Sequence, residues 1–252
     1  MSDLRRVSVQ VLTRRAEEAR ATMMELFPQG FEEVERTGGV ELVAYTDAAG
    51  EEKIWHFFGA AESADVESGW DERWRMFHQP VRVGRLWVGP PWVDPPTDAL
   101  LVVIDPGRAF GTGAHPTTQL CLELLQTLEP SSLLDVGCGS GVLAIAAALL
   151  GFDPVVGVDV ETASIEATLE NARANGVEVD ARLVERDDSL PPAGTVIANI
   201  SLQAVLALPA RTSADVLLTS GYLMSEEPHL PGYELAERRE IDGWAADVHR
   251  KR

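Results

Sequence analysis

The sequence predicts an α/β protein in which a small α+β unit precedes a doubly wound, mostly parallel sheet. Three observations support this class. A strand, a glycine-rich turn and a helix follow one another directly over residues 133–150. Strands and helices then alternate up to residue 219, as parallel β-α units do. Residues 1–66 instead show the order β-α-β-β-α-β, which is typical of a ferredoxin-like unit.

The glycine-rich turn is the most informative stretch of the chain. Leu133–Val136 has the pattern of a short buried strand, and Val142–Leu150 that of a helix. Between them stand Gly137, Gly139 and Gly141. Glycine adopts backbone angles that other residues resist, and it lets a ligand approach the main chain. The helix that follows offers free N–H groups at its start, so the stretch predicts a nucleotide-binding corner.

Two acids narrow the choice of ligand. The dinucleotide fingerprint is G-x-G-x-x-G, but Val142 stands where its third glycine would be. Asp135 precedes the turn, where a carboxylate would repel a diphosphate and attract an ammonium or a sulfonium. Asp159 ends the next strand and is placed to accept hydrogen bonds from ribose hydroxyls. S-adenosyl-L-methionine has a ribose and a cationic methionine tail but no diphosphate, so it fits both acids. The alternative is an ordinary α/β turn with a solvated acid.

Composition limits the partners and the compartment. The chain has 252 residues and a formal net charge of −19, which disfavours nucleic-acid binding and suits a basic partner, although solubility alone explains the charge equally well. Cys121 and Cys138 give no disulfide framework and no metal spacing. The run Val142–Phe152 is too short to span a bilayer, and Met1–Gln10 lacks a signal-peptide apolar region. These features predict a cytoplasmic protein without a metal.

In the first unit, hydrophobic periodicity predicts two helices and four strands. The expected elements are a strand over 6–12, a helix over 14–27 with Thr13 as its N-cap, a hairpin over 31–45 around Gly38 and Gly39, a loop over 47–50, a helix over 51–58 and an edge strand over 60–66. We expect a linker helix over 69–77, whose aromatic residues Trp70, Trp74 and Phe77 pack between two domains.

The linker is expected to continue with a strand pair over 81–88 that turns at Gly84, and a buried strand over 99–104 opens the second unit. A glycine-rich loop over 105–115 then leads to Pro116, which opens a helix over 117–128. Thr117 and Thr118 place hydroxyls at the start of this helix, where an anion such as a methionine carboxylate is favoured. For His115 a hydrogen bond that stabilises the loop is favoured over a role in catalysis.

The remaining pattern completes the sheet. It predicts a helix over 163–175, strands over 155–159, 179–184, 195–198 and 216–219, and a closing antiparallel pair over 233–240 and 244–249. Asp187 and Asp188 follow the third of the parallel strands; they either meet an adenine amino group or lie in a solvated loop.

Four motifs resemble one family. They are Asp105-Pro-Gly-Arg-Ala-Phe-Gly-Thr-Gly-Ala-His-Pro-Thr-Thr118, the turn Asp135-Val-Gly-Cys-Gly-Ser-Gly141, Ile197-Ala-Asn-Ile200 and Ser220-Gly-Tyr-Leu223. Together with the stretch from Trp70 to His78 they resemble the ribosomal protein L11 methyltransferases (PrmA type). The resemblance covers Trp70 to the C-terminus, whereas the first 65 residues match only in outline and look shorter than in the family.

The resemblance implies a fold, a reaction and a set of site residues. It implies a Rossmann-like class I methyltransferase domain over 99–252, linker elements over 67–98, and a ferredoxin-like domain over 1–66 that recognises the ribosomal protein. Thr118, Gly137, Asp159 and Asn199 match the family's positions for S-adenosylmethionine, and Phe110 and Gly111 match the loop over its methionine end. With Asp135 and Gly139 from the turn, these are the expected cofactor-binding residues.

Asn199 is also the expected catalytic residue. Its side-chain oxygen or its carbonyl would accept a hydrogen bond from the substrate amine and hold the lone pair toward the methyl group. No general base is assigned, because water can remove the proton. The chain is expected to act as a monomer on the lysine or N-terminal amines of L11.

Three rival functions remain. A base-modifying methyltransferase would use an aromatic wall after Asn199, but Ile200 and Ser201 stand there. A nicotinamide-dependent oxidoreductase conflicts with the missing third glycine. A non-catalytic binding module would not need to keep the glycine turn, Asp159 and Asn199 intact.

Overall fold

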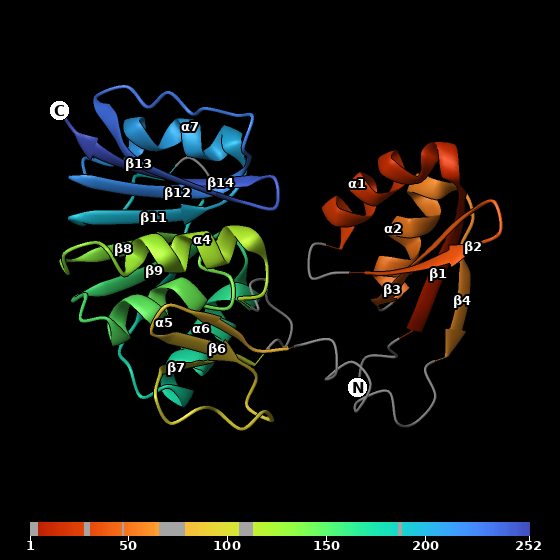
Figure 1. Cartoon of the computed structure of the whole chain (residues 1–252), viewed down its shortest axis with the longest axis horizontal. Helices are drawn as coiled ribbons and strands as arrows, with labels where there is room; N and C mark the ends of the chain where they lie inside the picture. The colour runs from red at the N-terminus through yellow and green to blue at the C-terminus, as the bar shows by residue number, and fades with distance from the viewer. Residues whose placement is uncertain (1–4, 28–30, 47, 66–78, 106–112, 186–187) are drawn as a thin grey trace. The chain divides into compact units, whose positions relative to one another are not determined.

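A computed structural model describes residues 5–27, 31–46, 48–65, 79–105, 113–185 and 188–252. The chain forms two compact units, residues 1–77 and 78–252, each described here by itself (Figure 1). The domain boundaries expected from the sequence, at residues 66 and 98, stay predictions, and the expected linker helix lies outside the described residues.

The first unit is a four-stranded antiparallel sheet with two helices on one face. Its strand order is β2-β3-β1-β4, which with the order βαββαβ along the chain defines a ferredoxin-like fold. Val7, Leu42, Met23 and Ile54 are buried together, so α1 and α2 cover the same face of the sheet (Figure 1). The elements are β1 (Arg5–Leu12), a 3-10 turn η1 (Thr13–Arg15), α1 (Ala16–Leu26), β2 (Glu32–Arg36), β3 (Gly39–Thr46), α2 (Ala48–Phe58) and β4 (Glu62–Asp65).

Two details of this unit differ from the expectation. The prediction that Thr13 caps the first helix is wrong: Thr13 opens the 3-10 turn, and α1 starts at Ala16 without a side-chain cap. The Thr13 N–H is already bonded to the carbonyl of Gly38, so Thr13 still belongs to the end of the sheet. The second helix begins at Ala48 and not at Glu51, so the expected loop over 47–50 is wrong for residues 48–50. Gly50 lies within this helix, and a Cβ there would meet the Thr46 hydroxyl oxygen at 1.7 Å, so the close approach of Thr46 explains the glycine.

The second unit is built on a seven-stranded sheet of order β10-β9-β8-β11-β12-β14-β13. All neighbours from β10 to β12 are parallel, and β14 is antiparallel to both β12 and β13. The strands are β8 (Leu133–Val136), β9 (Val155–Asp159), β10 (Asp180–Leu183), β11 (Thr195–Asn199), β12 (Val216–Leu223), β13 (Tyr233–Ile241) and β14 (Trp244–Lys251). The chain runs outward from β8 to β10 and returns to β11 on the other side of β8. The carboxyl ends of β8 and β11 therefore form the switch point where such sheets bind ligands.

Both faces of this sheet are covered. On one face Leu133, Ile197 and Leu218 pack with residues of α4 and α5, and on the other Leu134 and Val196 pack with residues of α7. This follows from the alternation of side chains along each strand. The helices are α4 (Pro116–Leu125), α5 (Val142–Leu149), α6 (Thr162–Ala174) and α7 (Leu202–Arg211).

A small sheet of order β5-β6-β7 also belongs to this unit. Its strands are β5 (Val81–Val83), β6 (Leu86–Gly89) and β7 (Leu100–Val103). The Asn175 side chain exchanges two hydrogen bonds with the backbone of Val103, at 2.8 and 2.7 Å, and so ties β7 to the end of α6.

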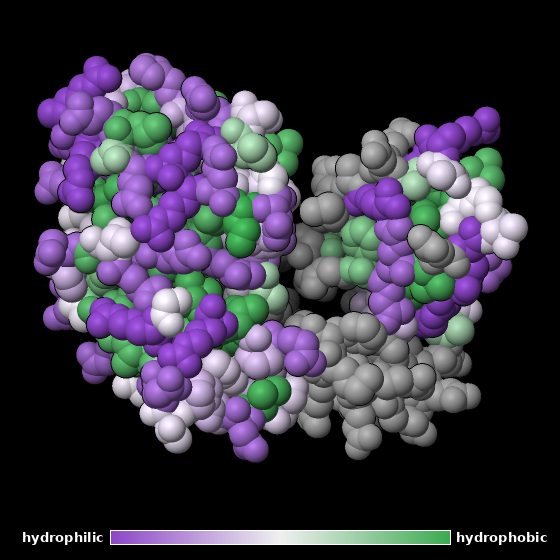
Figure 2. All heavy atoms as spheres, in the orientation of Figure 1, coloured by the Kyte–Doolittle hydropathy of each residue, from purple (hydrophilic) through white to green (hydrophobic). Residues whose placement is uncertain are grey.

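The strand β12 runs further than expected. Gly221 has a φ of +98° and forms a bulge, so the strand continues to Leu223 instead of ending at Thr219. Polar side chains cover most of the visible face of this unit, with hydrophobic ones scattered among them (Figure 2). No helix in the described part of the chain is long and apolar enough to cross a membrane.

Candidate active site

The glycine turn lies at the switch point of the large sheet. Gly137, Gly139 and Gly141 have φ values of +77°, +54° and +84°, which L side chains rarely adopt. A Cβ on Gly137 would also meet the Ile200 side chain at 2.6 Å. The N–H groups of Gly137 and Cys138 both donate to the carbonyl of Val158, at 2.8 and 3.1 Å, which fixes the turn against β9. The predicted strand–turn–helix corner is therefore confirmed as a local structure.

Asp135 is a buried carboxylate beneath this turn. It is 1% exposed, and its Oδ2 accepts a hydrogen bond from the Ala144 N–H at 3.1 Å. Its Oδ1 has no hydrogen-bond partner among the described residues. Burial raises the pKa of Asp135 to about 7, the Ala144 N–H lowers this pKa, and the neighbouring charge of Asp159 raises it. A buried acceptor without a partner favours a ligand that brings positive charge or a donor.

Asp159 connects the second strand to the glycine turn. Its Oδ2 accepts from the Gly139 N–H and its Oδ1 from the Glu161 N–H, both at 3.0 Å. These two bonds fix the direction of the carboxylate. Each oxygen keeps further lone-pair capacity, so the group can still accept bonds from two hydroxyls of a ribose.

A shallow pocket of about 510 Å³ lies beside Asp159. Val160 and Leu183 line it and are 49% and 57% exposed, unusually high for apolar side chains at the end of a sheet. Val184, Glu185 and Asp188 complete the lining. Sequence reasoning missed Val160 and Leu183; the available signal was an apolar residue directly after the acid that ends β9.

Asp188 was one of two acids considered for contact with an adenine amino group. Its Oδ2 instead accepts from the Glu185 N–H at 2.8 Å, and its carbonyl accepts from the side chain of Arg211 at 2.9 Å. Asp188 thus closes its own loop, at the rim of the pocket. Asp187 lies outside the described residues.

Asn199 ends β11 and faces the start of α4. Its Nδ2 donates to the hydroxyl oxygen of buried Thr118 at 3.2 Å, which leaves Oδ1 as the acceptor of this amide. His115 caps α4: its Nδ1 accepts from the Thr117 N–H at 3.3 Å and lies 2.7 Å from the Thr117 hydroxyl oxygen. The expected structural hydrogen bond of His115 is confirmed, and burial lowers the pKa of its imidazole.

The structure therefore brings most of the predicted site residues to one edge of the sheet. Contacts link the turn to Asp159, and Asn199 to Thr118, and Ile200 after Asn199 lies against Gly137. Phe110 and Gly111 lie outside the described residues. The roles of all these residues stay predictions. No group of three metal-binding side chains occurs among the residues that the structure describes.

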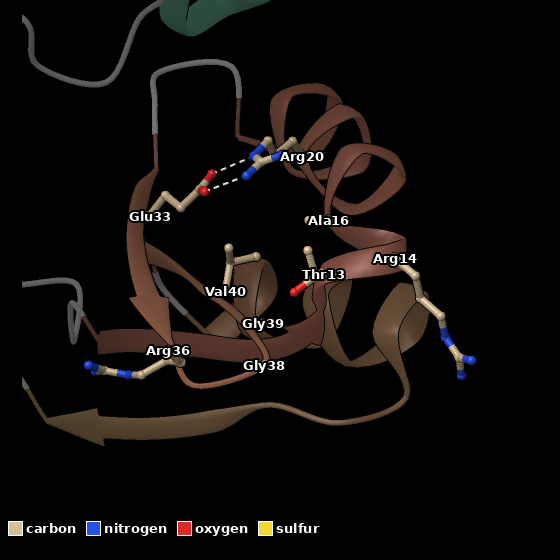
Figure 3. Close-up of a pocket in the computed structure, with 9 residues that line it drawn as sticks. All are labelled: Thr13, Arg14, Ala16, Arg20, Glu33, Arg36, Gly38, Gly39 and Val40. Carbon is tan, nitrogen blue, oxygen red and sulfur yellow. Dashed lines mark hydrogen bonds and ion pairs between the residues drawn. The ribbon is translucent and has the colours of Figure 1, made fainter.

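The first unit carries a separate hollow, lined in part by arginines (Figure 3). Arg20 makes a two-pronged ion pair with Glu33 across it, whereas Arg14 and Arg36 point away from it (Figure 3). Arg36 pairs with Glu41. The hollow thus has no convergent positive charge, and we assign it no ligand.

The sheet order, the antiparallel strand β14 between β12 and β13, and the glycine turn with Asp159 at the end of the next strand define a class I methyltransferase. The model of the family "Ribosomal protein L11 methyltransferase (PrmA)" matches residues 11–246, and the chain belongs to this family.

Individual relatives agree with this assignment. A ribosomal protein L11 methyltransferase of Pseudomonas putida strain F1 is 39% identical over 202 residues, which cover 74% of this chain and 69% of that protein. Its counterpart in Azotobacter vinelandii is 41% identical over 194 residues, 71% of this chain and 66% of that protein. The crystal structure of a ribosomal protein L11 methylase from Lactobacillus delbrueckii subsp. bulgaricus superposes with a TM-score of 0.63 at 27% identity, over 69% of this chain and 100% of that one.

Proposed function

We propose that this methyltransferase transfers methyl groups from S-adenosyl-L-methionine to lysine or N-terminal amines of ribosomal protein L11. The observation that carries the proposal is the family match over residues 11–246, which spans both units and the whole candidate site. The relatives named above are L11 methyltransferases, and the match includes the first unit, in which we place recognition of the ribosomal protein.

The described residues fit this cofactor at three points. Asp159 supports the ribose, because its fixed carboxylate has acceptor capacity left. The exposed apolar side chains of Val160 and Leu183 offer a surface for a flat base such as adenine. Asp135 favours the positive charge of the methionine end through its unpartnered buried oxygen. The Thr118 hydroxyl at the start of α4 favours the carboxylate of that end.

Gly137 and Gly139 complete the predicted cofactor residues, since the backbone of the turn leaves room for a ligand at close range. We place Phe110 and Gly111 over the methionine end on the strength of the family resemblance alone.

The main task of the protein in methyl transfer is to position the substrate amine. When bound, the cofactor supplies an already activated methyl group. The site must then present a neutral amine about 3 Å from that group, in line with the departing sulfur. Asn199 is suited to this task, because Thr118 holds its Nδ2 and leaves Oδ1 to accept a hydrogen bond from the amine. Lysine amines are protonated at neutral pH, so burial beside Asn199 must favour the neutral form, and water removes the proton.

The wider setting follows from this substrate. We propose that the protein is cytoplasmic, because ribosomal proteins are made and assembled in the cytoplasm. We also propose that it acts as a monomer. A net charge of −19 favours a basic protein partner over nucleic acid through long-range attraction.

The test is a labelling experiment. Purified protein is incubated with methyl-labelled S-adenosylmethionine and with extracts that contain or lack ribosomes, and the labelled band is identified by mass spectrometry. The proposal expects label on L11 with the intact chain and none with Asp159→Ala. Label on RNA, on another protein or on a small amine would assign a different substrate, and no label on any amine would overturn the proposal.

A further inference from the structure

Two exposed apolar side chains lie at the same sheet edge as Asn199. Leu223 ends β12 and is 48% exposed, and Met224 follows it at 50%. Asn199 pairs with Ser220 of β12, three residues before Leu223. Because a strand rises about 3.3 Å per residue, Leu223 lies roughly 10 Å beyond Asn199. A substrate whose amine reaches Asn199 can therefore reach Leu223 with a neighbouring residue.

Backbone and side-chain hydrogen bonds fix this corner. The Met224 N–H donates to the carbonyl of Gly243 at 2.9 Å, and the Leu223 N–H donates to the Glu226 side chain at 2.7 Å. The Arg238 guanidinium donates to the carbonyls of Met224 and Glu226, at 3.0 and 2.8 Å. The two apolar side chains are thus held at the surface by a preorganised loop, and little conformational entropy is lost when a partner covers them.

The charges around this corner are mostly negative. Glu226 and Glu227 follow Met224 in sequence, Asp242 precedes Gly243, and Glu240 pairs with Arg238 at 3.0 Å. Arg238 and Arg239 are the cations on the neighbouring part of β13. Arg238 is engaged with Glu240, with buried Asp247 and with the two carbonyls, and Arg239 with Glu237 and Glu123. We call the two apolar residues and the four acids the Leu223 corner: Leu223, Met224, Glu226, Glu227, Glu240 and Asp242.

Gly221 brings β12 close to the segment that follows Asn199. Gly221 stands between Ser220 and Tyr222, and a Cβ there would lie 2.0 Å from the carbonyl oxygen of Ile200. The glycine therefore lets β12 pass directly against the residue that follows Asn199.

We propose that the Leu223 corner binds a lysine- or arginine-rich segment of the protein substrate next to the amine that is methylated. The inference rests on the proposed function. The aliphatic stems of such side chains pack on Leu223 and Met224 while their charged ends meet the acids. RNA would meet net negative charge here, and two copies of the chain related by a two-fold axis would bring like charges together.

The experiment compares the double variant Leu223→Ser/Met224→Ser with a matched control. Leu235→Ser changes an apolar residue that is 54% exposed on β13 of the same sheet, but Leu235 pairs with His249, toward the opposite edge. The variants are assayed for kcat and KM with ribosomal protein L11 as the methyl acceptor, and for binding of S-adenosylhomocysteine by calorimetry.

The inference expects the KM for the protein substrate to rise roughly tenfold in the double variant, with the cofactor affinity unchanged and Leu235→Ser equal to the intact chain. Glu227→Lys, which leaves the apolar pair in place, should raise the KM at low salt, and this effect should fade near 1 M salt, where the screening length is about 3 Å. A KM that stays unchanged in both corner variants would overturn the inference. If the intact chain methylates no protein, the proposed function itself has failed.

Discussion

The buried carboxylate of Asp135 makes a prediction about stability and ligand binding together. Asp135→Asn keeps the shape and an acceptor for the Ala144 N–H but removes the negative charge beneath the glycine turn. Burial raises the pKa of Asp135 from 3.8 to about 7, so ionisation at neutral pH opposes folding. The same charge favours a cationic ligand. The substitution is therefore expected to stabilise the fold and to weaken cofactor binding.

The size of the effect follows from the shift. Each pKa unit corresponds to about 1.36 kcal/mol, so the charge of Asp135 costs the folded state on the order of 4 kcal/mol above pH 7. The folded state binds more protons than the unfolded state between pH 4 and pH 7, so this residue lowers the free energy of unfolding as pH rises through that window. In the Asn variant this residue does not change the free energy of unfolding with pH. Its buried NH2 group lowers that free energy by about 1–3 kcal/mol at every pH.

Urea unfolding from pH 5 to pH 9 measures the difference. The stability of Asp135→Asn relative to the intact chain should rise toward pH 7 and then stay level, and its affinity for S-adenosylmethionine should fall at least tenfold. Asp94→Asn, at an exposed loop position, serves as the control. A stability difference that does not change with pH would refute the account of Asp135 as a buried carboxylate whose charge is destabilised by loss of hydration.

Three further substitutions test other contacts. Asn199→Ala should lower kcat by about 100-fold or more while S-adenosylhomocysteine still binds, and unchanged turnover would remove Asn199 from the mechanism. Gly221→Ala should lower the free energy of unfolding by about 2 kcal/mol or more. The control Gly176→Ala should lower it by only about 1 kcal/mol, because Gly176 has a similar positive φ of +66° but open space where its Cβ would lie. Equal losses in the two variants would contradict the close approach of Gly221 to Ile200. Glu41→Gln should destabilise the first unit by about 1–2 kcal/mol in thermal unfolding, because buried Glu41 pairs with two arginines that are themselves 35% and 49% exposed and therefore partly screened by water. Ion pairing lowers the pKa of Glu41 to about 2, so the intact chain should lose this stabilisation as pH falls from about 4.5 toward 2, and Glu41→Gln should show no such loss.

The fold was predictable because its signals are local. The glycine turn, the acid at the end of β9 and the alternation of strands and helices each depend on a few consecutive residues, and all three are confirmed. The ferredoxin-like order of the first unit was also predicted correctly, although the family resemblance was weakest there.

The errors concern contacts between distant residues. Thr13 has the right residue type for a helix cap, but its N–H bonds to the carbonyl of Gly38, 25 positions away, which keeps Thr13 at the end of the sheet, and a 3-10 turn separates it from α1. The strand expected over 216–219 instead continues to Leu223, because Gly221 forms a bulge in β12. The apolar residue directly after the acid that ends β9 points to Val160, but Leu183 comes beside it only because β9 and β10 are neighbours in the sheet, and no local pattern identifies Leu183.

The central claim is that the glycine turn and Asp159 bind a cationic methyl donor and not a diphosphate. Calorimetric titration of the intact chain with S-adenosylmethionine, with NAD as the comparison and Asp159→Ala as the control variant, tests it most directly. The account predicts saturable heat with S-adenosylmethionine that Asp159→Ala abolishes, and none with NAD. Heat with NAD alone, or undiminished S-adenosylmethionine binding by Asp159→Ala, would contradict it.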